Sequence, residues 1–272
     1  MTSINTNVGA LKARSSTVQA TEKMQRAMER LSSGLRINSA ADDAAGLAVA
    51  GKMESQLRGI NMSIRNAQDG VGLIQTAEAG LNEIRNMVLR MRELAVQMAN
   101  GIYEDTPDRD NAQLEVAALL NQVNLIADNT KFNNVALLDG SFTTVNIQAG
   151  NNTAETIELS FIDVGQTGLS MNGADIGSQA SAVVVMGTMD TALNSIAAEQ
   201  AKFGSLINRL NFSIANLSKA SVTTEQAIGR VVDADFAQET TNLSKQQILN
   251  QAATSMLAQA NQSKQSILAL LQ

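Results

Sequence analysis

One uninterrupted apolar stripe between residues 189 and 231 is the strongest constraint on how this chain can fold. Steps alternating between four and three residues from Met189 reach thirteen positions, of which ten are apolar and none is charged. The charged residues of the same span, Glu199 among them, fall between these positions, and no proline interrupts the pattern. The pattern predicts one α-helix with a narrow buried face. At about 1.5 Å per residue this helix would be about 65 Å long, so it needs other long helices beside it to cover its stripe.

The composition favours a protein of long helices over an α/β enzyme. Among 272 residues there is one proline, and aromatic residues make up 3% of the chain. The net charge of −6 comes from interspersed residues of both signs without a basic tract, so nucleic acid is not an expected partner. The absence of cysteine excludes disulfide bonds and thiolate chemistry. Residues 1–10 do not resemble a secretory signal, and no apolar run is long enough to predict a membrane span.

Helix signals also precede this stripe. A first helix is expected to end near Ser33, before Gly34. Residues 37–46 then predict a break and a new helix start, with Asn38 or Ser39 as the N-cap and two aspartates in the first turn.

The four-three alternation runs from Met53 to Ile74, resumes at Leu81 after a phase slip and continues to Met98. It predicts a second long helix that ends at residues 100–101, Asn-Gly. Thr106 and Pro107 have the pattern of an N-cap followed by proline at the first helical position. They predict a third helix that runs to about Asp128.

The period changes to two after the third helix. Alternating side chains at residues 142–149 and 157–161, separated by a turn at residues 150–152, predict two short strands in a hairpin. After the long helix that contains residues 189–231, a last helix is expected over residues 249–271.

These elements predict a mainly α fold, in which the N- and C-terminal halves form a long antiparallel helical bundle resembling a coiled coil. A small β-hairpin cap at about residues 129–180 lies between the halves. We expect two domains. One is a terminal helical domain of residues 1–40 with 235–272, and the other contains residues 41–234.

Catalytic chemistry is not expected. With no histidine and no cysteine, the common general bases, nucleophiles and metal ligands are missing, and no cofactor is predicted. Aspartate groups at residues 42–43 and 105–110 could bind a cation, but a capping turn and a solvated loop explain them better, because the glycine and distal glutamate of a calcium loop are absent.

The terminal helices are the candidate functional surface. Their apolar stripes are broad enough to leave apolar area uncovered after the two helices pair, and neutral polar residues flank them. An ordinary two-helix coiled coil is one interpretation, and an assembly surface for copies of the same chain is the other. A membrane-surface helix is disfavoured, because the last helix has only Lys245 and Lys264 to attract anionic lipid.

Several motifs of the chain resemble those of bacterial flagellin. They are SINTN at residues 3–7, RLSSGLRINSAADDAAGLAVA at 30–50, RNAQDG at 65–70, RMRELAVQ at 90–97, FNNVALLDG at 132–140, DADFAQET at 233–240 and QANQ at 259–262.

The resemblance implies a subunit of the filament used for swimming motility. In this family the chain is exported unfolded by the flagellar type III apparatus, with an export chaperone, and is added beneath a filament cap outside the cell. The terminal helices form an inner tube, and the long helices form an outer tube of a helical tubular homo-oligomer. A hook-filament junction protein, which shares the terminal helices, is the alternative function.

The resemblance and the apolar pattern together assign polymerisation to the terminal helices, which we expect to be unpaired or disordered in the monomer. The residues assigned to polymerisation are Ile4, Val8, Leu11, Val18, Met24, Met28, Leu31, Leu249, Met256, Leu257, Ile267, Leu268 and Leu271.

The resemblance also implies contacts with innate immune receptors. Segment 90–97 is similar to the part of flagellin read by a vertebrate Toll-like receptor, although Leu89 occupies a position where the family usually has glutamine. Leucines near the C-terminus, Leu268 and Leu271 among them, resemble those read by cytosolic inflammasome sensors. The candidate Toll-like receptor contacts are Arg90, Arg92, Leu94, Gln97 and Glu115.

Overall fold

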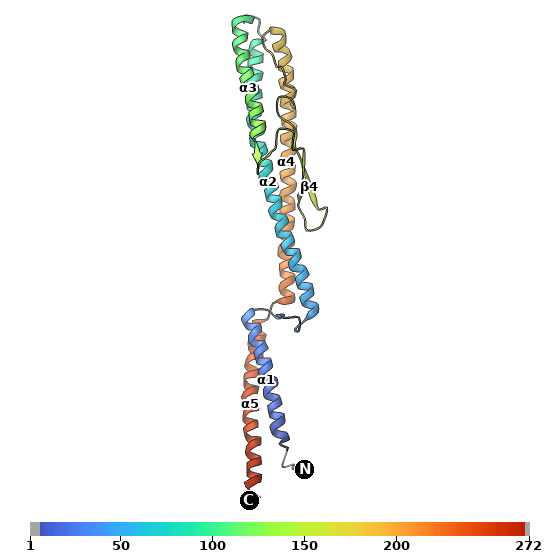
Figure 1. Ribbon diagram of the computed structural model, residues 1–272, viewed down its shortest axis with the longest axis vertical. Coiled ribbons are helices and arrows are strands. Elements are labelled where there is room, and N and C mark those ends of the chain that lie inside the picture. Colours follow the sequence, from blue (N-terminus) through green and yellow to red (C-terminus); the bar gives the residue numbers. More distant parts are fainter. Residues whose placement is uncertain (1–5, 270–272) are drawn as a thin grey trace. The chain divides into compact units, whose positions relative to one another are not determined.

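A computed structural model describes residues 6–269 of the chain and the side chains of residues 6–263. The chain divides into two compact units. We call Met1–Leu57 with Thr223–Gln272 the terminal unit, and Arg58–Val222 the central unit. The elements, labelled in part in Figure 1, are α1 (Val8–Ser33), α2 (Ala44–Met98), the short π-helical turn η1 (Asp105–Arg109), α3 (Asp110–Asn129), β1 (Lys131–Phe132), β2 (Val135–Ala136), β3 (Thr144–Gln148), β4 (Thr156–Ser160), α4 (Gln179–Val232) and α5 (Phe236–Ala269).

In the terminal unit, α1 and α5 pair antiparallel along their length (Figure 1). Near one end, Asn7 Nδ2 donates to the carbonyl oxygen of Ala260 at 3.0 Å. Further along, Asn250 Nδ2 donates to Thr21 Oγ1 at 2.7 Å. The expectation that the terminal helices are unpaired in the monomer is therefore wrong for the described residues, because one chain pairs them.

Side-chain caps define several helix ends. Asn7 Oδ1 accepts from the amide of Ala10 at 3.1 Å, and α1 ends at Gly34, whose φ of 73° suits glycine. The predicted cap of the next helix was misplaced. Asp43 Oδ1 accepts from the Gly46 amide at 2.8 Å at the start of α2, so Asp43 caps the helix instead of Asn38 or Ser39.

In the central unit, α2 and α4 run antiparallel. Gln200 Nε2 donates to Asn82 Oδ1 at 2.7 Å, and Ser221 Oγ donates to Asn61 Oδ1 at 3.1 Å. Helix α3 and the β segments contribute to the same hydrophobic core. The largest fully buried side chains of this core are Ile74, Leu81, Ile84, Met91, Leu137, Leu138, Leu159, Met171, Ile176, Met189, Ile196 and Phe203.

The predicted stripe of α4 is only partly the buried face. Met189, Ile196, Phe203 and Leu210 are buried as predicted, but the buried residues between them lie three positions after the preceding one instead of four; these are Ala192, Glu199 and Leu206. Glu199 is one of these, and it is 5% exposed. The prediction that its charge lies outside the buried face is wrong: the seven-residue repeat is kept, but the side of α4 that carries Ala192, Glu199 and Leu206 faces the core.

The third helix begins later than predicted. Thr106 is extended, with φ −130° and ψ 128°, and makes no capping hydrogen bond, so regular helix starts at Asp110. The turn before it is held by the buried Arg109, whose guanidinium donates to the carbonyl oxygens of Met98 and Asn100 at 3.0 Å.

Two antiparallel β-hairpins follow α3. The predicted hairpin is β3–β4, in which Thr144 pairs with Ser160 and Gln148 with Thr156. The shorter ladder β1–β2 was not predicted. The mainly α fold with long helices and a small β cap is confirmed.

Candidate assembly surface on helices α1 and α5

Alanine side chains form the contact of α1 with α5. Ala13, Ala20 and Ala27 are the buried residues of α1, each 8% exposed or less, and they recur every seven residues. On α5, Ala253 is buried. Methyl groups at a seven-residue spacing let two helices approach closely, but each contributes only about 0.8 kcal/mol of hydrophobic burial. The pair is therefore closely packed around a small apolar interface.

The large apolar side chains of these helices lie outside the alanine seam. Val8 and Leu11 on α1 are more than half exposed, and Met256 on α5 is 64% exposed. Ile248, also on α5, is 66% exposed. Large exposed apolar side chains of this kind are candidates for burial against another molecule.

The predicted polymerisation residues separate into two groups. Met24, Leu31 and Leu257 are half-buried beside the seam. Those exposed on α1 and α5 are Val8, Leu11, Val18, Met28, Leu249 and Met256. Ile4 and Leu271 lie outside the described residues, as do the side chains of Ile267 and Leu268.

A groove of about 530 Å³ is lined by residues of both helices, at the end of the pair near the start of α1. Gly9, Ala13, Met256 and Ala260 line it together with polar residues. A Cβ atom added at Gly9 would lie 3.6 Å from Ala260 Cβ, an ordinary van der Waals contact, so α1 and α5 lie side by side here. Met256, which is 64% exposed, is therefore part of the wall of this groove.

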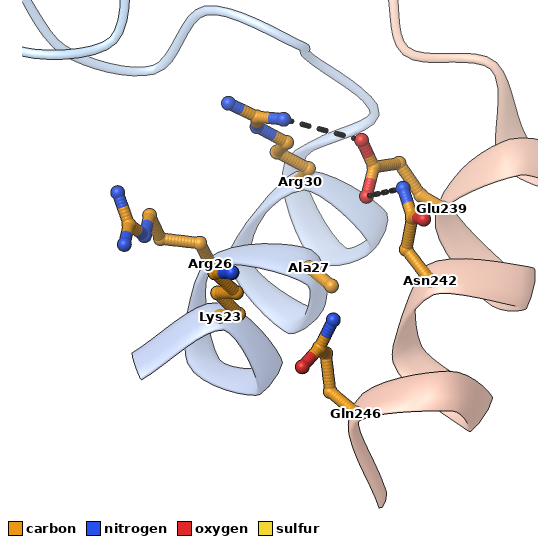
Figure 2. Close-up of a pocket in the computed structure, with 7 residues that line it drawn as sticks. All are labelled: Lys23, Arg26, Ala27, Arg30, Glu239, Asn242 and Gln246. Carbon is orange, nitrogen blue, oxygen red and sulfur yellow. Dashed lines mark hydrogen bonds and ion pairs between the residues drawn. The ribbon is translucent and has the colours of Figure 1, made fainter. Parts of the chain in front are cut away.

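At the other end of the pair, an ion-pair network closes the seam. Figure 2 shows Arg30 of α1 reaching Glu239 of α5, with a distance of 3.2 Å from Arg30 Nη1 to Glu239 Oε1. Arg30 Nη2 also lies 3.7 Å from Asp42 Oδ1. Asp42 in turn accepts from the Ser39 hydroxyl and amide, and these hydrogen bonds lower the pKa of the Asp42 carboxyl from its usual 3.8.

The chain segments beside this network also pair through their backbones. The Arg36 amide donates to the Val232 carbonyl at 2.6 Å, and the Ala234 amide donates to the Gly34 carbonyl at 2.9 Å. These bonds join the segment after α1 to the segment before α5. They complete a polar closure at the end of the alanine seam.

Among the candidate receptor contacts, the structure brings Arg90 and Glu115 together. Arg90 Nε donates to Glu115 Oε1 at 2.8 Å, and this pair raises the pKa of the guanidinium. Arg92 is paired with Asp190 of α4, which raises its pKa likewise. Leu94, in contrast, is 4% exposed. Its side chain is therefore part of the core, which corrects its assignment as a surface contact, whereas Gln97 is exposed.

The aspartates considered for cation binding serve local structure. Asp43 caps α2, and Asp105 pairs with Arg109. Among the described residues, no group of three or more carboxylates is placed to hold a metal ion. Within the same part of the chain, no helix is both long and apolar enough to cross a membrane.

Sequence reasoning missed the alanine seam and the Arg30–Glu239 pair. The seven-residue spacing of Ala13, Ala20 and Ala27 was visible, but larger apolar residues on other faces of the helix gave a stronger stripe. The ion pair joins residues 209 positions apart, and no local pattern marks it.

Two family models cover most of the chain. The bacterial flagellin N-terminal helical region matches residues 4–143, and the bacterial flagellin C-terminal helical region matches residues 186–271. Both terminal helices lie within these matches.

Individual proteins are similar over nearly the full length. A flagellin of Halalkalibacterium halodurans is 41% identical, and the match covers 98% of this chain and 99% of that protein. The flagellar filament 33 kDa core protein of Treponema phagedenis is 38% identical with the same coverage. The crystal structure of Bacillus cereus flagellin superimposes with a TM-score of 0.52 at 34% identity, over 56% of this chain and 88% of that one.

Proposed function

Since the chain belongs to the bacterial flagellin family, we propose that the exposed faces of α1 and α5 are the surface through which its copies polymerise. The chain is a structural subunit of the bacterial flagellar filament, an extracellular polymer that serves motility. What remains to be assigned is the part of the molecule that holds neighbouring copies together.

The exposure of large apolar residues on a helix pair with an alanine contact carries this proposal. The contact between the helices buries small side chains, whereas Leu11 and Val18 of α1 and Met256 of α5 stay exposed in the single chain. Burial of this apolar surface against other copies would favour association by about 25 cal/mol for each Å² removed from water. A helical polymer gives every copy the same neighbours, so the same faces are covered throughout.

This function places a boundary between two roles in the chain. Residues 1–40 with 235–272 would form the polymerising domain, and residues 41–234 would form the outer body with its β cap at about 129–180. The backbone hydrogen bonds between segments 34–36 and 232–234 support a boundary near residues 40 and 235. They join the segment that leaves α1 to the segment that enters α5, beside the helix pair.

A hook-filament junction protein was the alternative. The relatives named above are flagellins and a filament core protein, which favours the filament subunit. Bulk elongation of the purified chain separates the two functions, since a junction protein would not extend into long filaments.

Further partners belong to the same proposal. They are the flagellar export apparatus, an export chaperone, the filament cap, the Toll-like receptor and inflammasome sensors. For the Toll-like receptor, the exposed part of the candidate site is Arg90, Arg92, Gln97 and Glu115, in which both arginines are already paired with acidic residues. A reporter-cell assay with the monomer tests this contact, and the absence of a response would reject it.

The assembly surface is tested with a double variant, Leu11→Ala with Val18→Ala. Alanine is a strong helix former, so a loss of assembly would not come from a weaker α1. The change removes apolar area that is exposed in the single chain, and we expect the critical concentration for filament growth to rise about tenfold or more. Electron microscopy and light scattering of concentrated protein measure this.

Gln19→Ala is the matched control, because Gln19 is an exposed polar residue of the same helix that lies about 100° around the helix from Leu11 and Val18. It should leave the critical concentration within about twofold of the wild type, as expected for a surface substitution. Filament growth by the double variant at the wild-type critical concentration would show that this face of α1 is not an assembly surface.

A further inference from the structure

A basic cleft of about 310 Å³ lies beside the Arg30–Glu239 pair and is lined by residues of α1 and α5. Three cationic side chains, Lys23, Arg26 and Arg30, line it with Glu239 and neutral residues (Figure 2). Arg30 already forms ion pairs with Glu239 and Asp42. Lys23 and Arg26 are exposed and make no ion pair with any described residue, and Figure 2 shows Arg26 pointing away from α5.

The charge of the helix pair is opposite to that of the whole chain. Helix α1 carries five basic and two acidic residues, and α5 carries two basic and one acidic, which gives the pair a net charge of +4. The whole chain carries −6. Helix pairs of like charge repel when they are brought together, so copies that associate through them need opposite charges at the contact.

The two acidic residues of α1 are placed to supply these charges. Glu22 and Glu29 are exposed and, like Lys23 and Arg26, have no ion-pair partner among the described residues. On a helix of 3.6 residues per turn they lie opposite the alanine seam, on the side of α1 that also carries Leu11 and Val18. They are seven residues apart, about 10 Å along the helix, so both can face the basic flank of a neighbouring α1 that runs alongside.

We propose that the cleft lined by Lys23 and Arg26 receives Glu22 and Glu29 of α1 from a second copy of this chain. The contact joins two different faces of the same helix, so it is heterologous and extends into a polymer instead of closing as a dimer. The inference rests on the proposed function, because it presumes that copies meet through their terminal helices. It adds the charges that select the neighbour and set its register.

Two complementary variants test the contact. The cleft variant carries Lys23→Glu and Arg26→Glu, and the face variant carries Glu22→Lys and Glu29→Lys. Each variant by itself should assemble poorly, because its cleft and its helix face then carry charges of the same sign. The critical concentration of each should rise about tenfold or more. In an equimolar mixture, each acidic face meets a basic one wherever the two variants alternate. The mixture should therefore assemble near the wild-type critical concentration.

A matched control separates this contact from net charge. Arg14→Glu with Lys245→Glu changes the charge of the helix pair as much as the cleft variant does, at two exposed positions that do not line the cleft. It should assemble as the wild type does. Circular dichroism checks that each variant keeps the wild-type helix content. If the cleft variant loses helix, Lys23→Gln with Arg26→Gln replaces it as a neutral variant that should weaken assembly and reduce its dependence on salt.

The possible outcomes separate the two proposals. If the wild-type chain forms no polymer, the proposed function itself fails. If the wild type polymerises and both charge variants do so equally well, the carboxylate contact is rejected. If the mixture assembles no better than its components, Glu22 and Glu29 are not the groups that occupy the cleft, and the inference is likewise overturned.

Discussion

Arg30 Nη1 lies 3.2 Å from Glu239 Oε1, although the two residues are 209 positions apart in the chain. Glu239 is 8% exposed, so its carboxylate has lost most of its hydration. A buried carboxylate is stable in its charged form only when a partner compensates for that loss. The guanidinium is therefore needed where α1 and α5 meet.

Removing Arg30 should weaken the helix pair. We expect Arg30→Ala to destabilise the pairing of α1 and α5 by about 1–2 kcal/mol, which is below the range for fully buried pairs because the Arg30 side chain is 30% exposed. Amide hydrogen exchange in the two helices measures this in dilute monomer.

Glu239→Gln is the informative companion of that variant. It removes the buried charge while keeping an oxygen that can accept from Arg30, so its effect should be smaller than that of Arg30→Ala. Equal protection from exchange in wild type and Arg30→Ala would show that the ion pair does not stabilise the helix pair.

The alanine seam makes a second prediction. Ala20 is 4% exposed, and Ala20→Leu would place three additional carbons between closely packed helices. Overpacking of this kind costs about 1–3 kcal/mol, and exchange in α1 should accelerate accordingly. Ser15→Leu, at an exposed position of α1, adds a leucine without entering the seam. Its effect should stay within about 0.5 kcal/mol, and similar losses for both variants would contradict the seam.

The helices and the larger hairpin were predictable from the sequence, because their signals are local. The end of α1 follows from Gly34, whose positive φ favours glycine, and β3–β4 follows from a period of two. The ladder β1–β2 had a local signal too. Asn133 and Asn134 both have positive φ, as a two-residue hairpin turn requires, and Asn-Asn could have been read in this way.

The partner of each helix face could not be predicted in the same way. Hydrophobicity ranks valine and leucine above alanine, so Val18 was placed in the apolar stripe of this helix and Ala20 was overlooked. Which face is covered depends on how closely two helices approach, and that depends on residues from both ends of the chain. A subunit also keeps large apolar residues for its neighbours, so the strongest stripe need not be the buried one.

Asp42 provides a prediction of pH dependence. Hydrogen bonds from Ser39 lower the pKa of its carboxyl below 3.8 in the folded chain. A lowered folded pKa means that the carboxylate stabilises the fold above the unfolded pKa, and that this stability is lost as the pH falls through the folded pKa. Asp42→Asn should therefore be less stable than the wild type at neutral pH, with a difference that shrinks in acid.

An NMR titration of the Asp42 carboxyl group measures the cause directly. Ser39→Ala removes the hydroxyl donor, so the Asp42 pKa should rise toward 3.8 in that variant. A titration that is unchanged by Ser39→Ala would show that the hydroxyl does not hold the carboxylate.

Helix α4 carries one buried and one exposed phenylalanine, which make a matched pair of sites. Phe203 is fully buried, with its ring centroid 5.6 Å from that of Phe161, whereas Phe212 is 77% exposed. Phe203→Ala should lower the free energy of unfolding by about 3–5 kcal/mol, because it leaves a cavity. Phe212→Ala should change it by less than about 0.5 kcal/mol. Urea unfolding of the monomer, followed by circular dichroism, compares the two variants.

Glu199 is a carboxyl group in the buried face of α4. Burial raises its pKa above 4.5, and Lys202, whose Nζ lies 3.5 Å from Glu199 Oε2, opposes this only in part. Glu199 Oε1 is buried and accepts no hydrogen bond from the described residues. The fold therefore favours the protonated form, and the stability of the wild type falls as the pH rises from the unfolded pKa to the folded pKa.

Glu199→Gln removes the group whose ionisation has this cost. At neutral pH the variant should be more stable than the wild type by on the order of 1 kcal/mol, because it avoids burying a charge. Below the unfolded pKa both side chains are neutral, so the difference should nearly vanish. Urea unfolding at several pH values measures the difference, with the exposed Glu225→Gln as a control that should show no such trend. A Glu199→Gln chain that is less stable than the wild type at neutral pH would mean that the Lys202 pair outweighs the cost of burial.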